Sequence, residues 1–168
     1  MSMQQEIATL SARLGAVLLA RGEQVATAES CTGGLISGAL TEVAGSSDWF
    51  GYGFVTYSNA AKQSLLGVTA ATLARVGAVS ERTVREMAAG ARRASGAEWS
   101  VAVSGIAGPT GGSADKPVGT VWFAVSGPDG DEAFVCHFAG DRTEVRQETV
   151  RRALTRLIER AEQGGLSA

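Results

Sequence analysis

Residues 24–43 read QVATAESCTGGLISGALTEV, and the expected fold is built around this stretch. Its first six residues predict a short strand, and a helix is expected from about Thr32 to Val43. Between the two lie three side chains that can act as nucleophiles, Ser30, Cys31 and Thr32. In open α/β sheets, ligands bind at the carboxyl ends of strands, beside helix N-termini. The turn at residues 30–34 is therefore the first place to look for a functional site.

The remaining chain alternates between helical and strand patterns. Further helices are expected over 4–21, after Ser58 and Asn59, over 69–76, over 80–95 and from Asp141 to about 162; further strands are expected over 51–57, 99–104, 118–126 and 132–138. Strands separated by helices favour parallel pairing early in the chain, and the last two strands form an antiparallel hairpin. We expect a mixed, mostly parallel sheet between helix layers, in one domain spanning residues 1–168, with a frayed tail over 164–168.

Composition excludes several classes of protein. The chain has 168 residues, 45% of them hydrophobic, and a formal net charge of −2, so no basic surface for nucleic acid is expected. No apolar run is long enough for a membrane span, and the N-terminus lacks the pattern of a signal peptide. We therefore expect a cytoplasmic protein without a membrane partner. Two lone cysteines and one histidine give no familiar metal-ligand spacing, so no metal site is expected.

The turn TAESCTGG, residues 27–34, supports two interpretations. A helix that begins here offers unpaired N–H groups and a partial positive charge, which can hold an anion or an oxyanion. Gly33 and Gly34 would let a ligand approach the main chain. The alternative is an ordinary capped turn without chemistry, because Ser and Thr are common N-caps.

A lysine near the start of the next helix is a second candidate. In FVTYSNAAK, residues 54–62, Tyr57 ends a strand and Lys62 lies in the first turns of a helix. The helix N-terminus and burial would both lower the pKa of Lys62, and a neutral amine can act as a general base. A solvated surface lysine is the alternative for Lys62, and a core-edge tyrosine with a wet hydroxyl is the alternative for Tyr57.

Two later segments are candidate binding elements. The loop over 104–120, SGIAGPTGGSADKPVGT, is long and rich in glycine, but it has neither the P-loop ending nor the dinucleotide-binding pattern. Its N–H groups could line a pocket, with Ser104, Gly105 and Gly108 at its start. In GDR, residues 140–142, Asp141 is a good N-cap and Arg142 could clamp a phosphate or carboxylate. Arg142 alone is equally compatible with an exposed surface position.

A thiol site is a further alternative, with Cys31 as nucleophile and His137 as its base. His137 lies in a predicted strand next to Cys136, and no partner that would orient its ring can be placed from the sequence. Ser30 with Lys62 is the preferred pair.

Several of these motifs occur together in one known family. TAESCTGG, GSSDWFGYGFVTYSNAAK, GAVSERTV, VSGIAGPTGGSADKPVGTVWFAV and GDR, in this order, resemble the CinA C-terminal domain family over roughly residues 5–160. FAGDR departs slightly, since the family often has proline before the glycine. The resemblance implies a three-layer α/β/α sandwich and a tendency to form homo-oligomers. Many relatives also carry an N-terminal domain that is absent here, so its associated pyrophosphatase activity is not expected.

The resemblance also implies an activity and roles for the site residues. Members hydrolyse the carboxamide of nicotinamide mononucleotide to nicotinate mononucleotide and ammonia, in pyridine-nucleotide salvage, without a metal or organic cofactor. The family's Ser–Lys mechanism maps onto Ser30 as nucleophile and Lys62 as base, which acts directly or through the hydroxyl of Tyr57. Substrate contacts are expected from Cys31, Thr32, Gly33, Ser47, Ser104, Gly105, Gly108 and Arg142. Glu29 should face away from Ser30 and orient its neighbours. The rival interpretation is a non-catalytic nucleotide-binding or scaffolding protein linked to competence or DNA damage.

Overall fold

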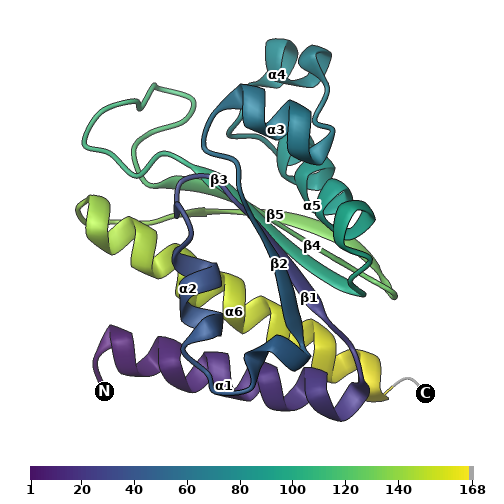
Figure 1. The fold of residues 1–168 in the computed structure, drawn as a ribbon. Coiled ribbons are helices and arrows are strands. Elements are labelled where there is room, and N and C mark those ends of the chain that lie inside the picture. The colour runs from purple at the N-terminus through teal and green to yellow at the C-terminus, as the bar shows by residue number, and fades with distance from the viewer. Residues whose placement is uncertain (167–168) are drawn as a thin grey trace.

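The computed structural model describes residues 1–166, with side-chain surroundings described as far as residue 164, and it has a five-stranded sheet between two groups of helices (Figure 1). The order of helices and strands is the one predicted from the sequence. The elements are α1 (Met3–Arg21), β1 (Val25–Glu29), α2 (Leu35–Thr41), the 3₁₀ turn η1 (Ser46–Asp48), β2 (Phe50–Val55), α3 (Asn59–Leu66), α4 (Ala70–Val76), α5 (Glu81–Ser95), β3 (Trp99–Gly105), β4 (Thr120–Gly127), β5 (Gly130–His137) and α6 (Arg142–Leu166).

Two boundaries differ by more than two residues from the sequence prediction, and β2 ends at Val55, so Tyr57 follows this strand instead of ending it. Helix α2 begins at Leu35 rather than near Thr32, because Gly33 and Gly34 have φ values of +57° and +105°. These left-handed conformations suit glycine and are incompatible with a right-handed helix. Helix α6 continues to Leu166, so the prediction of a frayed tail is wrong for 164–166, and residues 167–168 lie outside the described part of the chain.

The sheet is mixed, with strand order β2-β1-β3-β4-β5. Strand β1 pairs in parallel with β2 on one side and with β3 on the other. Strand β4 then runs antiparallel to both β3 and β5, which confirms the predicted late hairpin. Because β1, β2 and β3 point the same way, the loops that follow them gather at one edge of the sheet.

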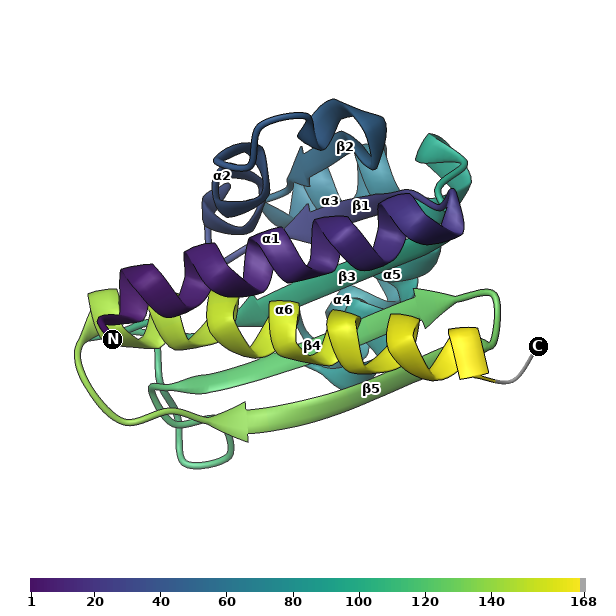
Figure 2. The ribbon, with the colours of Figure 1, turned by 90° about the horizontal axis from the view of Figure 1, so that it is seen from below.

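Each face of the sheet packs on its own helix layer. Helices α1, α2 and α6 cover one face, where α1 and α6 lie side by side (Figure 2). Helix α5 covers the other face, with α3 packed against it and α4 beyond (Figure 1). Side chains alternate along β1, so Val25 faces the first layer and Ala26 and Ala28 face the second. This arrangement confirms the α/β sandwich.

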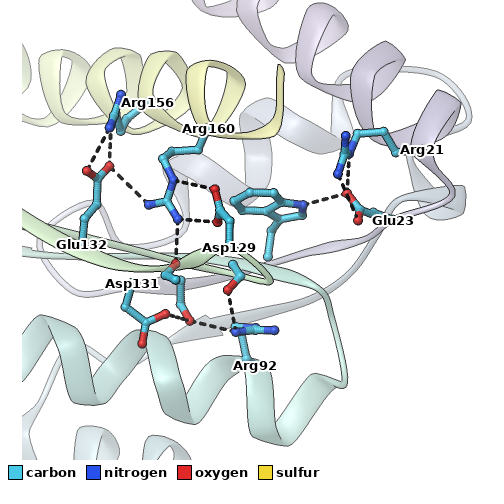
Figure 3. Close-up of polar contacts among 12 residues, drawn as sticks. Arg21, Glu23, Arg92, Asp129, Asp131, Glu132, Arg156 and Arg160 are labelled. Carbon is cyan, nitrogen blue, oxygen red and sulfur yellow. Dashed lines mark hydrogen bonds and ion pairs between the residues drawn. The ribbon is translucent and has the colours of Figure 1, made fainter. Parts of the chain in front are cut away.

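A polar network ties α6 to the sheet at the end opposite the parallel strand tips (Figure 3). Arg160 is 7% exposed and donates hydrogen bonds of 2.6 Å to both Asp129 Oδ1 and the Gly130 carbonyl. Its guanidinium also lies 5.6 Å from the ring centroid of Trp99, whose Nε1 donates to Glu23. The hydrogen bond from Arg160 holds the pKa of Asp129 below its usual value. The network joins α6, the β4–β5 turn, β3 and the segment that follows α1.

Replacement of Gly90 by alanine should destabilise the contact between α5 and α3. A Cβ at Gly90 would lie 1.9 Å from the carbonyl oxygen of Leu66, at the end of α3. Forced overpacking of this kind typically costs about 1–3 kcal/mol. We expect urea unfolding to show a loss of that size for Gly90→Ala.

Gly38→Ala is the matched control. Gly38 lies inside α2 and a Cβ there meets no atom within 4 Å, so alanine should leave stability unchanged or raise it by about 0.4–1 kcal/mol. Equal loss of stability in both variants would contradict the packing argument.

Candidate active site

Ser30 lies at the carboxyl end of β1, between the two neighbouring parallel strands. Its N–H donates to the Val103 carbonyl of β3 at 3.1 Å, and the residue is 8% exposed. Continuing the alternation of Ala26 and Ala28, its side chain faces the layer that contains α3. The nucleophile predicted from the sequence is therefore held in the main-chain framework of the sheet.

Lys62 reaches Ser30 from α3. Ser58 caps this helix by accepting a hydrogen bond from the Ala61 N–H, and Lys62 is the fourth helical residue. Its Nζ lies 2.9 Å from Ser30 Oγ and donates to the carbonyls of Thr56 at 2.9 Å and Tyr57 at 3.4 Å. The side chain is 1% exposed. The surface-lysine alternative is therefore wrong.

Burial lowers the pKa of Lys62 from its usual value of 10.5. Within the described residues, no carboxylate forms an ion pair with Lys62. No carboxylate partner therefore raises the pKa of Lys62 and stabilises its ammonium form. The opposing influence, the charge of a Cys31 thiolate, exists only when that thiol ionises. A neutral amine can donate its two hydrogens to the two carbonyls and accept the O–H of Ser30. This arrangement has the geometry of a nucleophile with its base.

Cys31 is not arranged as a nucleophile. Burial raises the pKa of its thiol to about 11, although the N–H groups of Cys31 and Gly105 act in the opposite direction. A thiol with this pKa stays protonated near neutral pH. His137 ends β5, which is three strands away from β1 in the sheet, or roughly 14 Å at the usual strand spacing. The pairing of Cys31 with His137 is therefore ruled out by the fold.

Glu29 points away from Ser30 and organises the start of α2, as the alternation predicted. Its fully buried carboxylate accepts hydrogen bonds from the Thr32 hydroxyl at 2.6 Å, the N–H of Ile36 at 2.9 Å and both the N–H and hydroxyl of Ser37. The first N–H groups of α2 are therefore occupied. They are not available to a ligand, which corrects the expectation that helix-start amides cover the site.

Two other N–H groups remain near Ser30. The Gly33 N–H donates to the Ser30 carbonyl at 3.1 Å, so it closes the turn. Among the described residues, the N–H groups of Cys31 and Thr32 donate to no main-chain carbonyl. The Gly34 N–H is likewise without a main-chain acceptor, but it lies further along the turn, so the N–H groups of Cys31 and Thr32 are the unpaired donors next to Ser30.

Tyr57 and Arg142 meet at the rim of the site. The Tyr57 hydroxyl accepts a hydrogen bond from Arg142 Nη2 at 3.1 Å, and Arg142 Nη1 donates to the Gly108 carbonyl at 2.8 Å. Tyr57 is 61% exposed. The hydroxyl is therefore not a relay between Ser30 and Lys62, which touch directly; Tyr57 contributes its carbonyl to Lys62 and its hydroxyl to Arg142.

A cavity of about 340 Å³ opens beside the Ser30–Lys62 pair, which is within the usual size range of small-ligand pockets. Eight residues predicted from the sequence line it: Ser30, Cys31, Tyr57, Lys62, Ser104, Gly105, Gly108 and Arg142. Four further lining residues, Ile106, Ala107, Thr110 and Gly111, belong to the loop over 104–120 that was expected to line a pocket, whereas Asn59, Ala78 and Val79 were not predicted. The motif GAVS contains Ala78 and Val79, but nothing local indicates that they line the same cavity as Ser30.

Three predicted substrate-binding residues do not line this cavity. The Thr32 hydroxyl is bound to Glu29, and Gly33 lies against Arg146 on the side of α6. Ser47 is exposed in η1, which precedes β2 and therefore lies at the opposite end of the parallel strands. The sequence did not show which side of the turn or sheet each side chain would occupy, so a role for these three residues in substrate binding stays a prediction.

Arg146 lies beside the site, although no pattern in the sequence distinguishes it. Its Nε donates to the Cys31 carbonyl at 3.1 Å and its Nη2 donates to the Thr32 carbonyl at 3.2 Å. It is one of several arginines on α6, and only the packing of α6 against the turn after β1 distinguishes it.

No three His, Cys, Asp or Glu side chains gather as metal ligands within the residues that the structure describes. Over the same part of the chain, none of the helices combines the length and apolarity needed to cross a membrane.

Comparisons with known proteins connect this geometry to a family. The protein named nicotinamide-nucleotide amidohydrolase PncC from Enterobacter agglomerans is 58% identical over 144 residues, which are 85% of this chain and 88% of that protein. The protein of the same name from Escherichia coli K12 is 53% identical over 154 residues, covering 90% and 93% of the two chains.

Solved structures agree with these sequence matches. The competence/damage inducible protein CihA from Agrobacterium tumefaciens is 50% identical, with a TM-score of 0.90 and coverage of 92% of this chain and 94% of that chain. The competence damage-inducible protein A from Klebsiella pneumoniae is 44% identical, with a TM-score of 0.88 and coverage of 91% and 95%. The model of the CinA C-terminal domain matches residues 7–161, and this chain belongs to that family.

Proposed function

We propose that this protein hydrolyses the carboxamide of nicotinamide mononucleotide, releasing nicotinate mononucleotide and ammonia. The observation that carries the proposal is the 2.9 Å contact between Lys62 Nζ and Ser30 Oγ, buried beside a cavity. A serine with an adjacent lysine of lowered pKa is suited to acyl transfer. The substrate is taken from the amidohydrolase names of relatives that are 58% and 53% identical over the matched residues.

Attack by Ser30 is the first half of the reaction. Neutral Lys62 removes the hydroxyl proton while Ser30 Oγ forms a bond to the carboxamide carbon, and the carbonyl electron pair moves to oxygen. The N–H groups of Cys31 and Thr32 are the proposed donors to this oxyanion. Loss of one such donor typically raises the barrier by about 3 kcal/mol. The Lys62 ammonium then returns its proton to the nitrogen as the C–N bond breaks, and ammonia leaves.

Water completes the reaction. Lys62, again neutral, takes a proton from a water molecule that adds to the acyl ester. The second tetrahedral intermediate collapses as the Lys62 ammonium returns this proton to Ser30 Oγ, and the acid product loses its proton to solvent as the carboxylate. No other base in contact with Ser30 Oγ is present among the described residues. Lys62 therefore serves both halves.

Arg142 is the proposed contact for the nucleotide phosphate. It lies at the cavity rim and is held there by Tyr57 and Gly108. A guanidinium fixed in this way can bind phosphate through its remaining N–H groups. Ser104, Gly105 and Gly108 line the same cavity and would contact the nucleoside.

Three broader expectations belong to the same proposal: a single domain, a cytoplasmic role in pyridine-nucleotide salvage, and assembly into homo-oligomers. Light scattering on the purified protein tests the last of these. Binding of nicotinamide mononucleotide without ammonia release would favour instead a sensor or scaffold related to the competence and damage names of the solved relatives.

Variants of the three central residues test the roles proposed for them. Ser30→Ala should abolish ammonia release from nicotinamide mononucleotide, and Lys62→Met should lower kcat by about 100-fold to 10,000-fold, the usual contribution of a general base. Cys31→Ala should keep most of the activity, because its thiol is buried and protonated. Circular dichroism confirms that each variant is folded. Substantial turnover by Ser30→Ala, or complete loss in folded Cys31→Ala, would contradict this assignment.

The pH profile tests the state of Lys62. Catalysis needs the neutral amine, so kcat/KM should rise with pH through the pKa of Lys62 and then level off. Because burial lowers that pKa, the midpoint of the rise should lie below 10.5. The residual kcat/KM of Lys62→Met should not show this rise with pH. A limb centred at or above 10.5 would argue against a buried lysine base.

Tyr57→Phe distinguishes a rim residue from a proton relay. The change removes only the hydroxyl that accepts from Arg142, so KM for the mononucleotide should rise several-fold, with kcat nearly unchanged. Steady-state kinetics measure both parameters. A fall in kcat at unchanged KM would mean that the hydroxyl takes part in the chemical step.

A further inference from the structure

We propose that Arg146 is a positioning residue that fixes the conformation of the turn after Ser30 and thereby the reactivity of Ser30. This inference rests on the proposed function for the identity of the nucleophile, but it concerns a side chain of α6, far from Ser30 in sequence. Arg146 does not line the cavity, so it would act through the turn and not by touching the substrate.

The contacts of Arg146 are directed at two successive carbonyls. Nε lies 3.1 Å from the Cys31 oxygen and Nη2 lies 3.2 Å from the Thr32 oxygen. The planar guanidinium presents its donors in a fixed fork, so two acceptors are held in one relative orientation. Hydrogen bonds from a charged donor are also stronger than those between neutral groups.

Other arginines of α6 have different partners. Arg151, Arg156 and Arg160 form ion pairs with carboxylates, whereas no ion pair involves Arg146 within the described residues. Among the described residues, both hydrogen bonds that the half-buried Arg146 guanidinium donates go to this turn. This side chain therefore donates its hydrogen bonds to the two residues that follow the nucleophile.

The turn needs such a restraint. Gly33 and Gly34 both adopt positive φ, and glycine has the widest choice of backbone conformations. In a planar trans peptide the C=O and the next N–H point in opposite directions. Because the Cys31 carbonyl points to Arg146 on α6, the Thr32 N–H points away from α6. A flip of this peptide would turn the Thr32 N–H, one of the proposed donors to the oxyanion, toward α6.

Contacts other than those of Arg146 also hold the turn, so the fold should survive the loss of Arg146. Glu29 holds the other side of the turn through Thr32 and the start of α2, and the Gly33 N–H still closes onto Ser30. Loss of Arg146 should therefore loosen the turn without unfolding the protein. This makes Arg146 a better test position than Glu29, whose replacement would leave several buried donors unpaired.

Labelling by a fluorophosphonate measures the reactivity of Ser30 independently of the natural substrate. In this reaction Ser30 Oγ bonds to phosphorus, fluoride leaves and the hydroxyl proton passes to Lys62. We expect Arg146→Met to slow labelling and to lower kcat for nicotinamide mononucleotide, each by up to about 100-fold, the effect of a misplacement near 1 Å. KM and the melting temperature should change little. Arg146→Lys, which keeps the charge without the fork, should fall in between.

Arg151→Met is the matched control on the same helix. Arg151 is 41% exposed and pairs with Glu148, so its loss should leave labelling and kcat at wild-type values. Added guanidinium ion should restore part of the lost labelling rate in Arg146→Met, and it should not change the labelling rate of Arg151→Met.

Several outcomes would overturn the inference. They are wild-type labelling and kcat in Arg146→Met, a raised KM at unchanged kcat, or no labelling of Ser30 in the wild type. If Arg146→Met does not fold, a full wild-type labelling rate in folded Arg146→Lys has the same meaning. If the wild type is labelled but does not release ammonia, the proposed substrate is wrong. The labelling rates of the Arg146 variants would still test the role of Arg146.

Discussion

Burial of the Lys62 amine against Ser30 is the constraint on which the candidate site depends. An amine that is 1% exposed must find polar partners inside the protein, since an unpaired buried polar group is costly. It finds the carbonyls of Thr56 and Tyr57 and the hydroxyl of Ser30. The end of β2, the first turn of α3 and the end of β1 must therefore stay in one fixed arrangement. The environment that places Lys62 is also the one that lowers its pKa.

Parallel pairing supplies that arrangement. Strand β1 lies between β2 and β3, so the segments that follow all three strands meet at one edge of the sheet. Side-chain alternation then directs successive residues of β1 to opposite faces of the sheet. Ser30 points toward α3 and its lysine, while Glu29 points toward α2 and holds the turn from behind. A shift of one residue in the pairing of β1 would exchange these two side chains and remove the nucleophile from its base.

The last helix completes a site that begins near residue 30. Arg142 and Arg146 lie one turn apart on α6 and face neighbouring segments of the cavity wall. Arg142 binds the Gly108 carbonyl and the Tyr57 hydroxyl, and Arg146 binds the turn after Ser30. The network around Arg160 anchors the other end of the same helix to the sheet (Figure 3). Polar contacts therefore join α6 to the rest of the fold near both of its ends.

The sequence by itself determined the order of helices and strands, the turn between β1 and α2 and the opposite directions of Glu29 and Ser30, because caps and periodicity are local properties of a chain. Local pattern could not decide that the Tyr57 hydroxyl binds Arg142 instead of joining the catalytic pair, nor that Ser47 lies at the far end of the sheet. Those outcomes depend on which strands are neighbours and in what register, and on the packing of α6, which brings Arg146 to the turn. Such contacts join residues distant in sequence, so only the tertiary structure decided them.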